Sequence, residues 1–294
     1  MKKVCPQCKN EFETDRRSRK YCSTKCFQKA TVMTSKISKT QEDRIVVKLA
    51  FDKSITIVIL ADAHNNMDYI NWFVNQVLQH DDWYVVINGD LWDEEQYSSQ
   101  PTTSVKPLSQ GVQEVKTALL PIADRIIGFV WGNHEVRCFR SASGKGTMPS
   151  YFDVFFEAMK AKNPNFQVAK LDTSLIVDIT IKGKTWKILF KHGKSAGKTF
   201  GVMEFHEVSD VNERIDVVVL SHLHLPLHLI VKKVATKTIE EEEQGNGEDR
   251  IMHYVRTTSG IAFAPYQDKA NYYVSPMGIT KLMFTENGIE VELI

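Results

Sequence analysis

Five short segments of this sequence carry aspartate, histidine or asparagine residues directly after an apolar run. These segments are Asp62-Ala63-His64, Gly89-Asp90-Leu91-Trp92-Asp93, Gly132-Asn133-His134-Glu135, His192-Gly193 and Ser221-His222-Leu223-His224. One histidine after a strand is more often a structural residue than a ligand. Burying all of these charged and polar groups without partners, however, would cost several kcal/mol for each charge. Carboxylate, imidazole and amide groups bind divalent metal ions, so the segments together predict a metal site.

The apolar runs before these segments must position them, and they have the composition of buried strands. We expect strands over residues 55–60, 83–87, 125–131, 185–191 and 215–220, and helices over 65–79, 112–120 and 151–159. An apolar run without alternation indicates a strand that is buried on both faces, and alternation of such strands with helices indicates a layered α/β core. In open α/β sheets, ligands bind beyond the carboxyl ends of the strands, so the five segments can converge.

The second half of the chain has more hairpin signals. We expect residues 175–181 and 185–191 to pair across Lys182-Gly183-Lys184, and residues 280–284 to pair with 289–293 across Glu286-Asn287-Gly288. The run Glu240 to Glu243, followed by Gly245-Asn246-Gly247, indicates a solvated hairpin tip. The predicted fold class is therefore α/β, with two mixed β-sheets packed between helices.

The ordered motifs DxH, GDxxD, GNHE, His-Gly and xHxH resemble the calcineurin-like metallophosphoesterase superfamily. This resemblance covers residues 55–224 and implies a two-metal phosphoesterase. Ala61 and Ser221 stand where many members carry glycine, which changes a turn but removes no ligand. Glu94 and Glu95 replace the Arg-Gly that is typical of protein Ser/Thr phosphatases, so that branch is disfavoured.

The resemblance implies a ligand set for two ions. Asp62, His64 and His224 are expected to hold one ion, Asn133, His192 and His222 the other, and Asp90 both. A bridging hydroxide between two such ions is the expected nucleophile on phosphorus. Mn²⁺ is the favoured ion, with Fe²⁺ and Zn²⁺ as alternatives.

The same resemblance makes His134 the candidate general acid and Asp93 its orienting partner. A helix cap or turn is an equally good interpretation of Asp93. Arg137 and Arg140 follow the third motif closely and are candidates for binding phosphate, although surface ion pairs explain each of them as well.

Residues 192–199 nearly match the phosphate-binding pattern GxxxxGK[ST], but His192 occupies the position of the first glycine. A side chain there hinders the backbone turn that wraps phosphates. We therefore favour the metal-ligand role of His192, and we retain Lys194 and Lys198 as candidate substrate contacts.

Four cysteines are spaced to hold a structural zinc ion near the N-terminus. They are Cys5, Cys8, Cys22 and Cys26. The segment resembles small treble-clef-like or ribbon-like fingers found beside nuclease and DNA-processing domains, notably in phage and mobile-element proteins. Its basic cluster, Arg16 to Lys20, is suited to a nucleic-acid backbone, and the alternative is a protein-binding finger.

Charge and composition divide the chain into three parts. Residues 1–48 hold 13 lysine and arginine residues against 5 acidic ones, whereas residues 49–294 hold 24 against 31. We expect a zinc finger over 1–30, a linker over 31–48 and the phosphoesterase domain over 49–294. No apolar run is long enough to span a bilayer and the start has no secretory signal, so we expect a cytoplasmic protein without membrane partners.

Three functions fit these features. A phosphodiesterase or nuclease acting on nucleic acid is favoured, because the two-metal site accompanies a basic finger. A phosphomonoesterase acting on a small molecule or nucleotide, with the finger as a docking element, is the alternative. A binding module on an inactive fold is disfavoured, because all seven inferred ligands and His134 are present.

Overall fold

The computed structural model describes residues 2–4, 9–13, 44–93, 107–143, 150–171, 173–193, 215–233, 250–260 and 277–294. Near the N-terminus, β1 (Lys2–Val4) pairs with β2 (Glu11–Glu13) in an antiparallel ribbon. The four cysteines that the sequence predicts as zinc ligands lie outside the described residues, as do Lys194 and Lys198.

The first of two large sheets contains six strands in the order β14-β13-β4-β5-β6-β7. Its strands are β4 (Ile55–Leu60), β5 (Trp83–Asn88), β6 (Ile126–Val130), β7 (Gln167–Val168), β13 (Thr280–Phe284) and β14 (Ile289–Leu293). Strands β4 to β7 run parallel, and the C-terminal hairpin joins them antiparallel through β13. Every residue of β4 and β6 is buried, as their continuous apolar sequences predict.

The second sheet also has six strands, in the order β11-β12-β10-β9-β8-β3. Its strands are β3 (Ile45–Phe51), β8 (Leu175–Ile181), β9 (Lys184–Lys191), β10 (Val217–Leu220), β11 (Leu227–Lys233) and β12 (Arg250–Arg256). The turn between β8 and β9 places Lys182 and Gly183 at φ 47° and 86°, the left-handed pair that a tight hairpin requires. Both sheets are mixed, so the predicted α/β fold with two mixed sheets is confirmed for the described residues. The sequence also predicts helices on both outer faces, but all the described helices pack on the first sheet.

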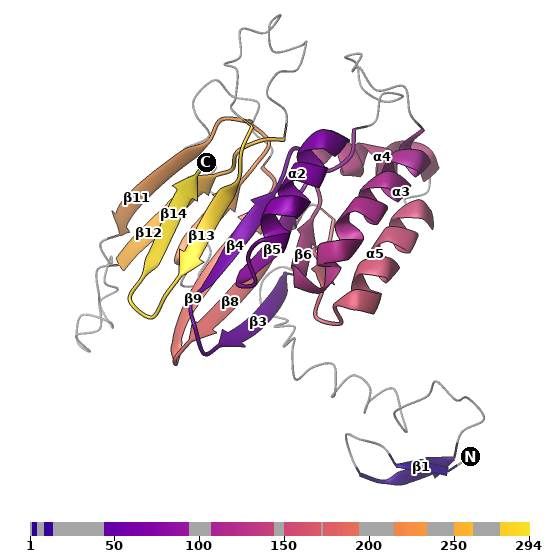
Figure 1. Cartoon of the computed structure of the whole chain (residues 1–294), viewed down its shortest axis with the longest axis horizontal. Helices are drawn as coiled ribbons and strands as arrows, with labels where there is room; N and C mark the ends of the chain where they lie inside the picture. The colour runs from indigo at the N-terminus through magenta and orange to yellow at the C-terminus, as the bar shows by residue number, and fades with distance from the viewer. Residues whose placement is uncertain are drawn as a thin grey trace, which may run out of the picture.

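The helices cover one face of the first sheet, and the second sheet covers the other (Figure 1). They are α2 (Met67–Leu78), α3 (Leu108–Leu119), the 3₁₀ helix η2 (Leu120–Arg125), α4 (Asn133–Ser143) and α5 (Ser150–Lys162). Because side chains alternate along a strand, Val58 and Leu60 pack against helices while Ile57 and Ile59 pack between the sheets. None of the helices that the structure describes is both long and apolar enough to cross a membrane.

The structure corrects one predicted boundary. Residues 45–48, which the sequence assigned to the linker 31–48, form the first part of β3 and pair in parallel with β8. Their short alternating pattern follows a polar stretch, and Val47 is buried between the two sheets. The predicted hairpin around Glu240 to Glu243 has described stems, since β11 and β12 pair antiparallel, but its tip lies outside the described residues.

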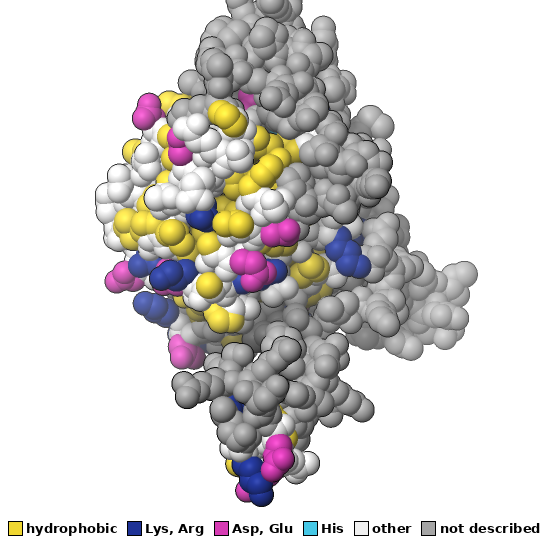
Figure 2. Space-filling model, turned by 90° about the vertical axis from the view of Figure 1, so that its right-hand side faces the viewer, with side chains coloured by type: hydrophobic (Ala, Val, Ile, Leu, Met, Phe, Trp, Pro, Cys, Tyr) yellow, Lys and Arg dark blue, Asp and Glu magenta, His cyan; other side chains and the backbone are white. Residues whose placement is uncertain are grey.

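On the face that Figure 2 shows, which is the right-hand side of Figure 1, basic and acidic side chains of the described residues alternate with apolar ones. No segregation of charge by sign is visible among the coloured side chains of this view. The coloured side chains of this face thus show no excess of basic over acidic residues like that of residues 1–48.

Candidate active site

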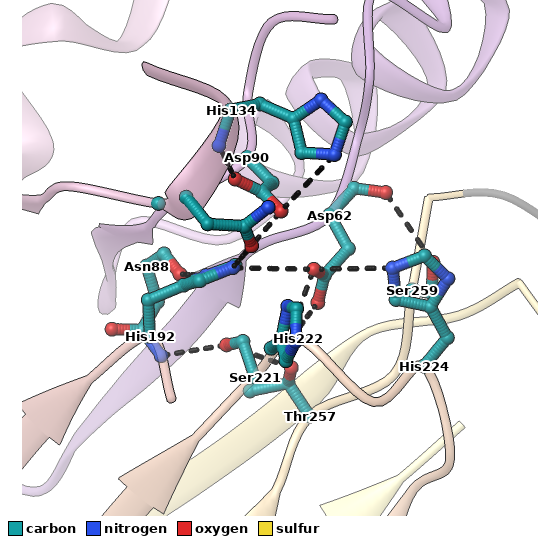
Figure 3. A network of polar contacts seen from close by, with 12 residues as sticks. Asp62, Asn88, Asp90, His134, His192, Ser221, His222, His224, Thr257 and Ser259 are labelled. Carbon is teal, nitrogen blue, oxygen red and sulfur yellow. Dashed lines mark hydrogen bonds and ion pairs between the residues drawn. The ribbon is translucent and has the colours of Figure 1, made fainter. Parts of the chain in front are cut away.

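The predicted ligands meet at the seam between the two sheets (Figure 3). The first sheet contributes Asp62 and His64 after β4, Asp90 and Asp93 after β5, and Asn133 and His134 after β6. The second sheet contributes His192 after β9, and His222 and His224 after β10. Parallel strands of each sheet end at this edge, which brings segments far apart in the sequence together.

The loops that carry these residues turn sharply into the left-handed region of the backbone. Asp62, Asp90 and His222 have φ angles of 49°, 50° and 75°. Such angles are uncommon in residues other than glycine, and several together mark a functional site. Backbone hydrogen bonds hold the loops, since Asp62 N–H donates to Gly89 O at 3.0 Å and His64 N–H donates to Asp90 O at 3.0 Å.

Gly89 is required by both conformation and space. Its φ is 85°, and a Cβ atom at this position would lie 2.5 Å from His192 Nδ1. The glycine therefore lets the loop after β5 approach the end of β9. This close approach is the local reason that Asp90 and His192 contact each other.

The first ligand group is Asp62, His64 and His224, whose ligand atoms lie within 4.8 Å of one another. Asp62 Oδ1 is 3.3 Å from His224 Nε2. Burial alone would raise the pKa of Asp62, but His224 and His192 outweigh it and lower the pKa. The carboxylate is therefore ionised and available to a cation.

His64 presents a buried ring nitrogen to this group. Its Nε2 atom has no hydrogen-bond partner among the described residues. Burial, followed by the neighbouring His134, lowers the pKa of His64 to about 4. The imidazole is neutral at physiological pH, and a buried lone pair without a donor is suited to a metal ion.

The second ligand group is Asp90, His192 and His222, again within 4.8 Å of one another. Asp90 Oδ2 lies 3.0 Å from His192 Nε2, while His192 Nδ1 donates to the carbonyl of Asn88 at 2.8 Å. Burial would lower the pKa of His192, but Asp90 and then Asp62 outweigh it and raise the pKa to about 10. A proton on His192 thus supplies positive charge that a bound cation would replace.

The two groups adjoin each other. His192 Nε2 lies 4.0 Å from Asp62 Oδ1 of the first group. Asn133, which the sequence assigned to the second ion, places its side-chain oxygen 3.2 Å from the same nitrogen. The inward atom of this amide also lies 3.0 Å from Asp90 Oδ2, so the amide oxygen, when it is turned inward, can share a cation with that carboxylate. The residues present therefore fit divalent metal ions.

His134 lies beside the ligands and contacts Asp93, its predicted partner. Its Nδ1 is 2.9 Å from Asp93 Oδ1, and its Nε2 is 4.0 Å from Asp90 Oδ2. Burial would lower the pKa of His134, but Asp90 and Asp93 outweigh it and raise the pKa. The structure thus agrees with the first of the two interpretations of Asp93, because its carboxylate contacts the imidazole of His134.

Glu135 is a site residue whose role the sequence did not predict. Its buried carboxylate accepts hydrogen bonds from the N–H groups of Asp90, Leu91, Trp92 and Gly132 at 2.7 to 3.1 Å. Burial, followed by Asp90, raises the pKa of Glu135 to about 7. The residue holds the loop that presents Asp90, and its position in GNHE was the only sequence signal.

Ser221 joins the sheets beneath the ligands. Its Oγ accepts hydrogen bonds from Asn88 Nδ2 at 2.6 Å and from Thr257 Oγ1 at 3.0 Å. Its N–H donates to the carbonyl of His192 at 3.0 Å. The departure from glycine at this position thus adds buried bonds between β5 and the ends of the second sheet.

The structure describes one of the four candidate phosphate contacts. Arg137 is exposed on α4, and its Nη2 lies 3.3 Å from the side-chain amide of Asn133. Arg140 follows on α4, but its side chain lies outside the described set, as do Lys194 and Lys198. His192, the residue that interrupts the phosphate-loop pattern, directs its ring to Asp90.

A comparison with protein families agrees with this arrangement. The family model described as calcineurin-like phosphoesterase matches residues 55–226, a range that contains every predicted ligand. No curated protein sequence matches the chain. Among solved structures, the chain is similar to an archaeal phosphodiesterase at 14% identity, with 82% of this chain and 100% of that chain covered and a TM-score of 0.41.

Two further solved structures have comparable similarity. A phosphoesterase from E. coli, Yfce, has 13% identity, covers 82% of this chain and 100% of that chain, and gives a TM-score of 0.39. A 5'-nucleotidase precursor from Thermus thermophilus has 12% identity, covers 82% of this chain and 54% of that chain, and gives a TM-score of 0.42.

Proposed function

The chain belongs to the calcineurin-like phosphoesterase family and is a metal-dependent phosphoester hydrolase, and we propose that its substrate is a phosphodiester bond of a nucleic acid. The observation that carries this proposal is the basic excess of residues 1–48 in a chain with a phosphoesterase site. A nucleic-acid backbone is the polyanion that such a segment attracts through counterion release. We assign the same segment a structural zinc ion on Cys5, Cys8, Cys22 and Cys26.

Seven residues would hold the catalytic ions. Asp62, His64 and His224 would hold one, Asn133, His192 and His222 the other, and Asp90 both. Mixed carboxylate, imidazole and amide donors suit Mn²⁺, which we propose as the activating ion, with Fe²⁺ and Zn²⁺ as alternatives. When bound, such ions supply the Lewis acidity that activates water and stabilises charge on phosphoryl oxygens.

His134 would transfer a proton to the leaving oxygen of the ester. Its Nε2 faces the ligands while Asp93 holds Nδ1 at 2.9 Å. Asp90 and Asp93 raise the pKa of His134, so the ring holds a proton more readily than a free imidazole does. Asp93 fixes the ring orientation, and the proton at Nε2 is then directed to the site.

The first test compares substrates with Mn²⁺ present. Turnover of a bis-aryl phosphodiester, an aryl phosphomonoester, single-stranded DNA and double-stranded DNA would be measured with the full chain and with Asp90→Asn. We expect the diester and DNA to be cleaved, and Asp90→Asn to abolish cleavage. Hydrolysis of the monoester alone would identify a phosphatase.

The second test separates the basic segment from the catalytic site. A triple variant, Arg16→Gln, Arg17→Gln and Arg19→Gln, is expected to weaken DNA cleavage and its salt dependence but not diester hydrolysis. The matched control, Lys53→Gln, Lys160→Gln and Lys162→Gln, removes the same charge from exposed positions elsewhere. Equal loss of DNA cleavage in both triple variants would show that the basic segment has no specific role.

A further inference from the structure

The amide of Asn133 lies between the ligand residues and Arg137. Its inner atom is 3.0 Å from Asp90 Oδ2, and its outer atom is 3.3 Å from Arg137 Nη2. A carboxylate oxygen only accepts hydrogen bonds, and a guanidinium only donates them. Rotation of the amide by 180° therefore changes both contacts at once.

With the nitrogen inward, the protein satisfies the amide by itself. The nitrogen then donates to Asp90 Oδ2 at 3.0 Å and to His222 Nδ1 at 2.8 Å, and it lies 3.2 Å from His192 Nε2, which itself is 3.0 Å from Asp90 Oδ2. The oxygen turns outward and accepts from Arg137 Nη2 at 3.3 Å. This is the arrangement that we expect without metal ions, because Arg137 and Asp90 each have a matching partner.

With the oxygen inward, the amide can serve as a metal ligand, since an amide nitrogen does not bind these ions. The outer nitrogen then faces Arg137 Nη2 at 3.3 Å, and two donors point into the same space. Arg137 is exposed, so this space is open to a ligand. Residues four apart on a helix share one face, which keeps both donors together on α4.

We propose that Arg137 and the amide N–H of Asn133 form a two-donor anchor for a phosphoryl oxygen of the substrate, and that metal binding creates it by turning the amide. The proposal rests on the proposed function, because it needs metal ions and a phosphoester. An arginine suits the role, since its guanidinium presents several fixed donors to phosphate oxygens. The ion-free orientation instead keeps Arg137 bound to Asn133.

The anchor couples metal binding to anion binding. Metal ions release Arg137 from Asn133, so bound ions increase phosphate affinity through Arg137. By thermodynamic linkage, phosphate increases metal affinity by the same factor. Removing Arg137 is expected to reduce both effects equally.

The test titrates inorganic phosphate into the full chain loaded with Mn²⁺ and follows binding by calorimetry, without turnover. Arg137→Gln is expected to weaken phosphate binding about tenfold to a hundredfold, the loss for one or two charge-assisted hydrogen bonds. Arg137→Lys keeps the charge and is expected to lose less. The control Lys160→Gln removes an exposed charge on α5 and is expected to bind phosphate like wild type.

A second titration measures Mn²⁺ affinity in phosphate-free buffer. Arg137→Gln is expected to bind Mn²⁺ at least as tightly as wild type, because it lacks the bond that favours the ion-free orientation. Phosphate affinity within about twofold of wild type, or clear loss of Mn²⁺ affinity, would overturn the anchor. Failure of wild type to hydrolyse any phosphoester would instead overturn the proposed function.

Discussion

At the scale of single residues, the pKa values of His64 and His134 are shifted in opposite directions although their rings are in edge contact, with centroids 4.6 Å apart. Burial and then His134 lower the pKa of His64 to about 4, whereas Asp90 and Asp93 outweigh burial and raise the pKa of His134. A neutral ring serves as a ligand and a protonated ring serves as an acid. Burial without a close carboxylate partner thus favours the neutral form of His64, and the two carboxylates favour the protonated form of His134, as the two proposed roles require.

Asp93→Asn tests the second role. We expect kcat to fall about tenfold to a hundredfold, because the amide no longer fixes the charged ring of His134. The pKa of His134 is also expected to fall. As pH rises, the variant should therefore lose activity at a lower pH than wild type does. A pH profile of kcat checks both effects.

The control for this variant is Asp124→Asn, an exposed position on η2. Metal content measured by atomic absorption is expected to match wild type in both variants. If Asp93→Asn loses metal in proportion to activity, the carboxylate is instead a ligand.

His192 gives the ion-free protein a stability that depends on pH. Its pKa is raised from 6.5 to about 10 by Asp90 and Asp62, which outweigh burial. A pKa raised by folding contributes stability that is fully present below pH 6.5 and is lost as pH rises through 10. Thermal unfolding of chelator-treated protein is therefore expected at progressively lower temperature from pH 7 to pH 10.

The comparison variant for this pH series is His192→Gln. It lacks the titrating group, so its unfolding temperature is expected to change less over the same range. Parallel curves for the two proteins would assign the pH dependence to another residue.

At the scale of elements, each ligand loop depends on a neighbour that holds its backbone. Glu135, in the first turn of α4, accepts four N–H groups, three of them from the loop after β5. A single carboxylate thus connects β6 and α4 to the loop that carries Asp90. The helix is a support for the neighbouring loop as well as a carrier of Asn133.

Glu135→Gln is expected to destabilise the fold by about 2 to 4 kcal/mol, because the amide group turns donors toward backbone N–H groups and leaves some of them unpaired. Urea unfolding measures the loss. The control Glu157→Gln changes an exposed residue on α5 and is expected to cost less than about 0.5 kcal/mol. Equal stability of the two variants would contradict the role of Glu135.

The strands that carry ligands could be predicted from the sequence, because each is a short apolar run followed by a polar turn. The C-terminal hairpin was predicted with its observed bounds, 280–284 and 289–293. Strand β3 was missed because its alternating residues follow a polar stretch and depend on β8 for burial. Helix α4 was missed because it begins at Asn133, inside a motif of polar residues.

The site itself was predicted as a set of residue types but not as a set of contacts. The sequence indicated that Asp93 could serve His134, yet only the fold brings their side chains to 2.9 Å. The bonds of Ser221 to Asn88 and Thr257 join residues more than 30 positions apart. Such pairings depend on sheet order, which local patterns do not determine.

At the scale of the whole molecule, metal ions would join the two sheets, because each proposed ion would take ligands from both. Asp62 and His64 follow β4 of the first sheet, while His224 follows β10 of the second. A ligand that binds only the folded protein stabilises it by about 2.7 kcal/mol at a free concentration one hundred times its dissociation constant. Chelation is therefore expected to lower the thermal unfolding temperature at pH 7.

The same measurement on a ligand variant tests whether the stabilising ions bind at the predicted ligands. In Asp90→Asn, added Mn²⁺ is expected to raise the unfolding temperature much less than in wild type. An equal shift in both proteins would place the stabilising ions away from the seam.

The order of strands in the first sheet has a consequence for synthesis of the chain. Strand β4 is flanked by β5, which follows soon after it, and by β13, which follows some 220 residues later. The hydrogen-bonding edge of β4 that β13 covers stays open until residues 280–284 have left the ribosome. Pairing across such a sequence distance is slow, and an unpaired edge invites association with other chains. The nascent protein is therefore exposed to association through this edge until β13 has been synthesised and has paired with β4.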